Sequence, residues 1–155
     1  MAPQYCSFHV GDLFLGIEVE RIQEVLRDAV ITRVPLAPPE VRGLINLRGQ
    51  IVTAIDLRRR FGLDDEPTDE TGATLILSFD EELVSLVADR AGDVVEVAEE
   101  VFEDPPDTLK GERRRLIRGA FKLENRLLLA LDVENVLAVG TKGDAPAAPG
   151  GGEDV

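Results

Sequence analysis

The sequence has 155 residues and a mass of 16.9 kDa, which is enough for one compact domain or two very small ones. Hydrophobic residues make up 44% of the chain and charged residues 30%, a balance typical of soluble globular proteins. The 17 basic and 30 acidic residues give a net charge of −13, which argues against nucleic acid and anionic membrane surfaces as partners.

The residue types that support chemistry are scarce. Cys6 is the single cysteine, so it excludes an internal disulfide and suits a reducing compartment. His9 is the single histidine, so one chain cannot build a multi-histidine metal site. No apolar run reaches the roughly 18–20 residues of a membrane span, and the start has no signal-peptide pattern. We therefore expect a cytoplasmic protein without a metal site, a cofactor, catalytic residues or a membrane-inserted segment.

The first ordered segment alternates between apolar and polar residues. Cys6, Phe8 and Val10 alternate with Ser7 and His9, the period of two that is typical of a half-buried strand. We expect Cys6 to be a small core residue and His9 to face solvent or a polar rim.

The next segment, residues 18–26, is ambiguous. Val19, Ile22, Val25 and Leu26 recur at helical spacing and favour an amphipathic helix. Val25 and Leu26, with Val30 and Ile31 nearby, also suit a strand. The pattern alone leaves both open.

A hairpin is predicted further along the chain. Two apolar runs, residues 44–47 and 51–55, flank Arg48-Gly49-Gln50, and Gly49 is expected to have a positive φ angle. Residues 121–123 and 127–131 repeat the pattern around Glu124-Asn125-Arg126, where asparagine is the next best residue for that angle.

Each hairpin is followed by an aspartate in a helix-capping position. Asp56 precedes a short helix at 57–61, and Asp132 precedes another at 133–137. A further strand pair is expected at 75–79 and 83–88.

The two halves of the chain match each other. A shift of 76 positions aligns the hairpins and their caps, and a shift of 69 aligns the segments before them. We infer a duplicated unit of about 60 residues and about ten short strands, which implies two small barrels packed side by side. The expected organisation is a subdomain at 4–63, an acidic loop at 64–72, a second subdomain at 73–138 and a disordered tail at 140–155.

Charge is distributed unevenly between these parts. Residues 1–63 hold eight basic and seven acidic residues, whereas residues 64–140 hold eight basic and twenty acidic ones. The asymmetry indicates that the two parts face different partners, although acidic surface that merely confers solubility explains it equally well. The near-neutral part is expected to present surface arginines: Arg42, Arg48, Arg58, Arg59 and Arg60.

Three stretches resemble a known family: Val41-Arg42-Gly43-Leu44-Ile45-Asn46-Leu47-Arg48-Gly49-Gln50-Ile51-Val52, with Ile22-Gln23-Glu24-Val25 before it and Asp56-Leu57-Arg58 after it. They are similar to the CheW family, the coupling proteins of bacterial chemosensory arrays, and the resemblance extends over about residues 4–138. It implies an all-β fold of two five-stranded SH3-like barrels with short capping helices, and a strand rather than a helix from Ile22 to Arg27.

The resemblance also implies a function. Members of the family are not enzymes, and they hold a CheA-type histidine kinase, through its regulatory domain, against the cytoplasmic tip of chemoreceptors. That tip is a helical bundle that docks in the groove between the two barrels. The positions expected to contact the receptor are Ile22, Glu24, Gly43, Leu44, Asn46, Arg48 and Gly49. No cofactor is implied, and the chain is expected to reach the receptor arrays at the membrane only through its partners.

The residue types suit this task. Ile22, Leu44 and Ile45 could cover the apolar stripe of a receptor helix, although Ile22 and Val25 fit a barrel core equally well. Gly43 has no side chain, so a helix could approach its backbone closely.

Two polar residues have a structural alternative beside the receptor contact. Arg48 can donate forked hydrogen bonds to a partner's carboxylate, or it can pair with Glu24 or Asp56 at an exposed turn. Asn46 either contacts the partner or shapes the hairpin with a hydrogen bond.

One loop departs from the family. Residues 102–108 are acidic and proline-rich, where family members commonly carry a basic and an aromatic residue. Two alternative functions stay open: an adaptor for a chemosensory-like pathway that does not control swimming, and a small-molecule or hydrolytic site between the barrels. The second needs a cluster of titratable groups, and neither His9 nor Cys6 is well placed for it.

Overall fold

The computed structural model describes residues 3–63 and 72–138. The predicted disordered tail lies outside these residues, as does the predicted acidic loop except for Gly72. The elements follow in this order: β1 (Gln4–Val10), β2 (Leu13–Glu18), η1 (Val19–Arg21), β3 (Ile22–Arg27), β4 (Val41–Leu47), β5 (Gln50–Asp56), α1 (Leu57–Arg60), β6 (Ala73–Phe79), β7 (Glu82–Ala88), β8 (Arg90–Glu96), η2 (Glu99–Val101), β9 (Phe102–Glu103), α2 (Glu112–Arg115), β10 (Ile117–Lys122), β11 (Leu127–Leu131) and α3 (Val133–Leu137).

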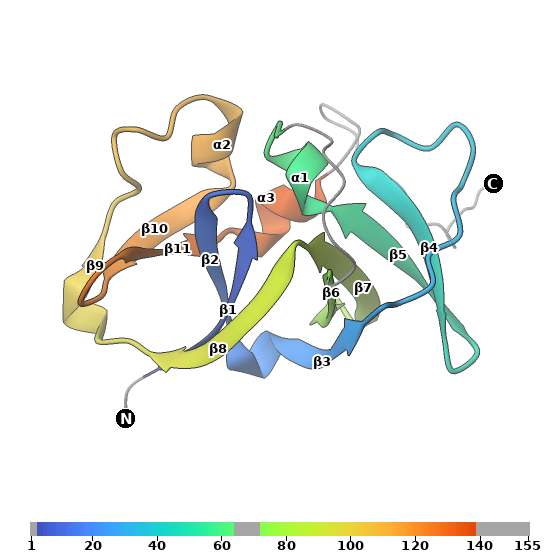
Figure 1. Ribbon diagram of the computed structural model, residues 1–155, viewed down its shortest axis with the longest axis horizontal. Helices are drawn as coiled ribbons and strands as arrows, with labels where there is room; N and C mark the ends of the chain where they lie inside the picture. The colour runs from blue at the N-terminus through green and yellow to red at the C-terminus, as the bar shows by residue number, and fades with distance from the viewer. Residues whose placement is uncertain (1–2, 64–71, 139–155) are drawn as a thin grey trace.

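The strands form two sheets that lie side by side along the long axis of the molecule (Figure 1). One has the order β8-β1-β2-β11-β10-β9 and is called the β1 barrel below; the other has the order β3-β6-β7-β5-β4 and is called the β4 barrel. Neighbouring strands are antiparallel except for β2 with β11 and β5 with β7, which are parallel. The predicted all-β fold with short helices is therefore confirmed.

The elements follow the predicted duplication. Shifting β1, β2 and β3 by 69 residues places them on β6, β7 and β8, and shifting β4, β5 and α1 by 76 residues places them on β10, β11 and α3. The two sheets then have the same order of equivalent strands.

The predicted division into subdomains 4–63 and 73–138 is wrong, because each sheet takes strands from both repeats. The β1 barrel contains the first two strands of the first repeat and the last four of the second, whereas the β4 barrel contains the last three strands of the first repeat and the first two of the second. The two parallel pairings join the repeats. Hydrophobic alternation shows which face of a strand is buried, but it does not show which strand lies beside it.

Neither sheet closes through a continuous ladder, but each is bridged in the same way. In the β4 barrel, Thr32 exchanges two backbone hydrogen bonds of 2.8 Å with Leu44 on β4. In the β1 barrel, Glu103 on β9 pairs with Ala120 on β10, at the equivalent position. The segment after the third strand of each barrel thus reaches the opposite edge strand, as in a small barrel, and the two residues of β9 bring that sheet to six strands.

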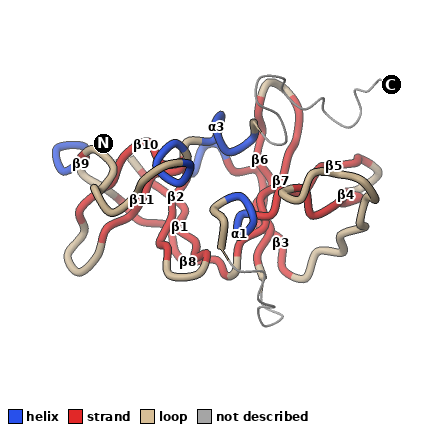
Figure 2. Tube along the Cα trace, turned by 90° about the horizontal axis from the view of Figure 1, so that it is seen from above, coloured by secondary structure: helices blue, strands red, loops and turns tan. Residues whose placement is uncertain are grey.

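Apolar side chains form three clusters. One fills the β1 barrel, including Tyr5, Phe14 and Phe121, and another fills the β4 barrel, including Ile45 and Val52. The largest lies between the two barrels and includes Phe8, Leu15, Leu57, Phe61, Leu75, Leu86, Leu116 and Val136. Figure 2 shows α1 and α3 along this seam, where their apolar faces join the central cluster.

Both predicted helix caps are confirmed. Asp56 accepts hydrogen bonds from the backbone N–H groups of Arg58 and Arg59 at 3.0 and 3.3 Å, and Asp132 accepts one from Asn135 at 3.1 Å. Such caps satisfy N–H groups that a helix cannot pair internally.

Two local predictions are corrected by the structure. Residues 22–27 form β3 after a single 3₁₀ turn, so the helical alternative for this segment is wrong and the strand is confirmed. Asn125 does not have a positive φ angle. The β10–β11 pairing ends at Lys122 and Leu127, which leaves a four-residue loop, and such a loop does not need the left-handed conformation of a two-residue turn.

The prediction that Arg60 is a surface arginine is also wrong. Its side chain is only 7% exposed and its guanidinium donates to the carbonyls of Asn135, Val136 and Ala138 at 2.7, 2.9 and 3.2 Å. It also pairs with Glu112 at 2.8 Å. Arg60 therefore connects the end of α3 to α1 at the seam between the barrels.

Among the described residues, no helix has the length and apolar character needed to cross a bilayer.

Candidate partner-binding site

The predicted site residues all lie in the β4 barrel, on its two edge strands and on the turn between β4 and β5. β3 carries Ile22 and Glu24, β4 carries Gly43, Leu44 and Asn46, and the turn consists of Arg48 and Gly49. The site therefore belongs to one barrel rather than to both walls of a groove.

The turn between β4 and β5 is a two-residue hairpin loop. Leu47 pairs with Gln50, and the residues between them, Arg48 and Gly49, have φ angles of +51° and +90°. The positive φ of Gly49 is as predicted, and Arg48 shares the left-handed conformation. Asn46 Oδ1 accepts a hydrogen bond of 2.8 Å from the backbone N–H of Gly49. The structural alternative for Asn46 is thus confirmed: its side chain holds the turn.

Arg48 reaches from the turn to the opposite edge strand. Its two terminal nitrogens lie 2.5 and 3.4 Å from the two carboxylate oxygens of Glu24 on β3. The Arg48 side chain is 70% exposed. The predicted pairing with Glu24 is confirmed, and Asp56 instead pairs with Arg42 at 3.2 Å. The Arg48–Glu24 pair therefore connects β3 to the β4–β5 hairpin at the surface.

The pairing fixes the charges of both groups. The hydrogen bond from Arg48 lowers the pKa of Glu24, and the same bond raises the pKa of Arg48. Both side chains are consequently ionised at neutral pH. A guanidinium has five N–H donors, and Glu24 accepts from two of the nitrogens, so Arg48 keeps donors for a second carboxylate. The pair can bind an acidic group on a partner without separating.

Gly43 has a different neighbour from the one expected. It is buried, with a φ angle of +154°, and a Cβ atom at this position would collide with the carbonyl oxygen of Thr32. The close approach that glycine permits is made by the chain's own backbone, at the Thr32–Leu44 bridge. The idea that Gly43 leaves room for a partner helix is therefore wrong.

The apolar side chains around the pair are also redistributed. Ile45 lies in the interior of the β4 barrel and cannot cover a partner, and Ile22 is half-buried against the central cluster. Val25 and Ile51 are exposed instead. Ile51 lies directly across from Asn46 in the β4–β5 ladder, on the outer face. Strand alternation could have found Ile51, because its neighbour Val52 faces the core.

The Arg48–Glu24 pair has no counterpart in the second repeat. The positions equivalent to Arg48 and Glu24 in the second repeat are Glu124 and Asp93, two acids that cannot form an ion pair with each other. The fold is thus repeated, whereas the Arg48–Glu24 pair occurs in the β4 barrel alone.

Comparison with known proteins identifies the family of this chain. A family model described as "CheW-like domain" matches residues 4–140. The chain belongs to the CheW family. It is 37% identical over 131 residues to the chemotaxis protein CheW of Bacillus subtilis, covering 84% of this chain and 83% of that protein. It is 30% identical over 134 residues to CheW of Helicobacter pylori, covering 86% and 81% of the two chains.

A solved structure agrees on the fold. The scaffolding protein TtCheW from Thermoanaerobacter tengcongensis superimposes with a TM-score of 0.86 at 24% identity, covering 96% of this chain and 99% of that one. CheW proteins are chemotaxis adaptors and scaffolds rather than catalysts. Within residues 3–63 and 72–138, no three or more His, Cys, Asp or Glu side chains are grouped so that they could hold a metal ion.

Proposed function

We propose that this CheW-family chain is a non-enzymatic adaptor that couples the cytoplasmic tip of chemoreceptors to the regulatory domain of a CheA-type histidine kinase. The observation that carries the proposal is the exposed Arg48–Glu24 pair, which the β4 barrel has and the β1 barrel lacks. The chain would act in the cytoplasm and reach the receptor arrays at the membrane through its partners.

The surface beside the pair suits a receptor helix. Arg48 supplies donors for a carboxylate, and the exposed side chain of Ile51 with the half-buried Leu44 supplies an apolar surface. The site lies on paired strands and a hydrogen-bonded turn, so its geometry is set before a partner binds. Preorganisation of this kind reduces the entropy cost of association.

Substitution of Arg48 tests the proposal. We expect Arg48→Ala to weaken binding of a receptor-tip fragment by about tenfold or more, because a charge-assisted hydrogen bond is lost. Binding of the kinase regulatory domain should stay unchanged. Arg126→Ala is the matched control, since Arg126 lies in the corresponding hairpin of the β1 barrel. Isothermal titration calorimetry with both partners measures the effect, and an Arg48 variant that binds the receptor tip as wild type does would refute the proposed site.

The alternative of a hydrolytic or small-molecule site between the barrels has no observation in its favour. The seam holds the central apolar cluster. Cys6 packs against that cluster, whereas the ring of His9 lies 5.1 Å from that of Phe14, which belongs to the β1-barrel cluster. The two residues thus face opposite sides of β1. The other alternative, a pathway that does not control swimming, uses the same surface, and identification of the co-purifying receptor and kinase decides it.

A further inference from the structure

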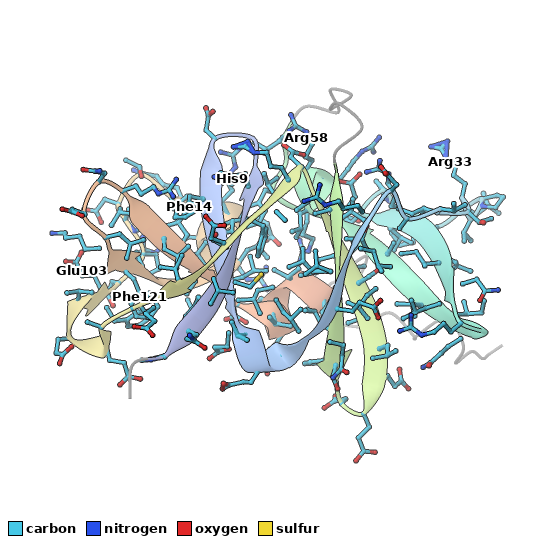
Figure 3. All side chains as sticks on the ribbon, turned by 60° about the horizontal axis from the view of Figure 1, so that its bottom comes forward. His9, Phe14, Arg33, Arg58, Glu103 and Phe121 are labelled. Atoms are coloured by element: carbon cyan, nitrogen blue, oxygen red, sulfur yellow. The ribbon has the colours of Figure 1, made fainter. Side chains whose placement is uncertain are left out.

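A second charged surface lies in the β1 barrel, at the end that carries the turn between β1 and β2. His9 on β1 is directly across from Phe14 on β2 and from Arg90 on β8. Residues directly across from each other in an antiparallel pair have side chains on the same face. Phe14 belongs to the cluster that fills the barrel, so His9 and Arg90 lie on this inward face where the strands end. Figure 3 shows His9 and Phe14 together, away from Glu103.

Arg126, in the loop between β10 and β11, reaches the same place. Its guanidinium carbon lies 3.8 Å from the centroid of the Phe14 ring, which is 5.1 Å from that of His9. An aromatic face holds a guanidinium by electrostatic attraction, and the N–H groups at its edge stay available as donors. Arg90, His9, Phe14 and Arg126 thus form a row across neighbouring strands, which we call the β1 rim.

The two arginines of the β1 rim have no acidic partner in the described chain. Both are exposed, and within residues 3–63 and 72–138 no hydrogen bond or ion pair engages either guanidinium. Asp89, the acid next to Arg90 in the sequence, is already engaged: its Oδ2 accepts from Arg58 at 2.5 Å and from the backbone N–H of Gly11 at 2.7 Å. A protein with a net charge of −13 therefore keeps two uncompensated cations around one histidine.

His9 responds to the positive charge of the rim. Burial, Arg90 and Arg126 lower its pKa, and the opposing effect of Asp89 is smaller. Its Nδ1 atom is buried and has no hydrogen-bond partner among the residues that the structure describes. The imidazole is consequently neutral at pH 7. An anion that neutralises the two arginines would favour the protonated ring, so the pKa of His9 reports occupancy of the rim.

The β4 barrel does not repeat this surface. The duplication gives His9, Arg126 and Arg90 the following counterparts, in that order: Ser78, Gln50 and Arg21. Ser78 and Gln50 carry no charge, and Arg21 lies 3.8 Å from the carboxylates of both Glu18 and Glu134. The loop that carries Arg126 is the equivalent of the turn that carries Arg48. Each barrel thus presents an arginine at the same place of the repeat, with different residues around it.

We propose that the β1 rim binds an acidic segment of a partner protein, with carboxylates of that segment on Arg90 and Arg126. Arginines donate forked, charge-assisted hydrogen bonds to carboxylates, and both guanidinium groups are free to do so. The proposal goes beyond the coupling of receptor and kinase and does not depend on it, because it concerns the other barrel and other arginines.

The spacing of the rim favours a polypeptide over a small anion. Arg126 lies over Phe14 on β2, and β2 is two strands away from Arg90 on β8. Neighbouring strands are about 4.8 Å apart, so the two cations are separated by roughly 10 Å. A single carboxylate or phosphate is too small to contact both. Acidic residues seven positions apart on one face of a helix are about 10 Å apart along its axis, which matches the row.

Titration of the full, tag-free chain with an acidic peptide tests the proposal. The probe is a helical peptide of about 20 residues with glutamates seven positions apart on one face, and the same peptide with glutamines is its control. His9 is the single histidine of the chain, so its proton resonance reports on the β1 rim alone. We expect the glutamate peptide to shift this resonance and to raise the pKa of His9 toward its ordinary value of 6.5. The glutamine peptide should do neither.

Three variants separate the rim from net charge and from folding. Arg90→Gln and Arg126→Gln should each weaken the peptide affinity, taken from the His9 shift, by about tenfold, because each removes a charge-assisted hydrogen bond. Lys110→Gln is the matched control: it removes an exposed positive charge outside the rim and should bind as wild type does. All three side chains are exposed, so the melting temperatures should stay close to that of wild type.

Arg48→Ala separates this proposal from the proposed function. It should weaken binding of the receptor tip and leave the effect of the peptide on His9 unchanged, so each proposal can fail alone. A glutamate peptide that leaves the His9 resonance unchanged, or that binds both rim variants as tightly as wild type, would overturn the proposal. So would inorganic phosphate that raises the pKa of His9 as much as the peptide does at the same concentration, which would indicate a small-anion site. A His9 resonance that shifts with the concentration of the chain alone would assign the rim to a second copy instead.

Discussion

Replacement of Arg60 should destabilise the protein far more than replacement of a surface arginine. Its guanidinium is buried and donates to three carbonyls at the end of α3, in addition to its ion pair with Glu112. In Arg60→Met the aliphatic stem is kept, but these acceptors lose their donor. Val136, one of the three, is fully buried, so water does not replace the lost bond easily.

The size of the effect follows from burial. Glu112 is half exposed and stays solvated in the variant, so the main cost is the buried carbonyl of Val136 left without a donor. A buried acceptor without a partner costs about 1–3 kcal/mol, and we expect Arg60→Met to lower the free energy of unfolding by roughly that amount. Arg115 is the matched control because it pairs with the same carboxylate, also at 2.8 Å, but is 54% exposed. Exposed pairs contribute about 0–1 kcal/mol, so Arg115→Ala should have little effect.

Urea denaturation followed by circular dichroism measures the free energy of unfolding of both variants, and thermal denaturation measures their melting temperatures. For a chain of this length each kcal/mol shifts the melting temperature by about 2–4 °C, so Arg60→Met should melt roughly 2–12 °C below wild type. The hydrogen bond from Arg60 lowers the pKa of Glu112, so that pKa should also rise in the variant. A loss below about 1 kcal/mol, no larger than that of Arg115→Ala, would show that the α3 carbonyls do not depend on Arg60.

Two further outcomes are expected. Gly43→Ala should lower the free energy of unfolding by about 2–4 kcal/mol, because the new Cβ collides with the backbone of Thr32. Gly62 also has a positive φ angle but lies in open space, so Gly62→Ala should lower it by only about 1 kcal/mol. Equal losses for the two variants in thermal unfolding would contradict this expectation. Burial, together with the charge of Arg90, lowers the pKa of His9 from its usual 6.5. As the pH falls, His9 therefore binds a proton at a higher pH in the unfolded chain than in the folded chain, which favours unfolding. The urea midpoint should fall as the pH drops below about 6.5, and His9→Gln should reduce this pH dependence.

Local structure was predictable where a residue type in its sequence context favours a single conformation. An aspartate before a short apolar run caps a helix, and Gly49 between two apolar runs marks a two-residue turn. Arg60 was not predicted to be buried, because a run of three arginines favours a surface. The helical spacing of Leu57, Arg60 and Phe61 does indicate a shared buried face.

The site was predictable in position but only partly in role. The sequence motif placed Arg48, Asn46 and Glu24 near one another, and the structure shows them linked through the turn and the ion pair. The role of Gly43 depends on Thr32, eleven residues away and outside the motif. Contacts between distant segments, like the pairing of strands from different repeats, are set by the assembled fold and leave no periodic signal.

The exchange of strands between the repeats links the two barrels covalently as well as through packing. The chain crosses from the β1 barrel to the β4 barrel between β2 and β3 and returns between β7 and β8, and the central apolar cluster lies between the two barrels. Melting should therefore occur in one cooperative step rather than barrel by barrel. A protease that cuts the chain between residues 63 and 72 would leave two fragments that both contribute strands to each of the two sheets and share the central apolar cluster. Native electrophoresis should therefore still show a single band.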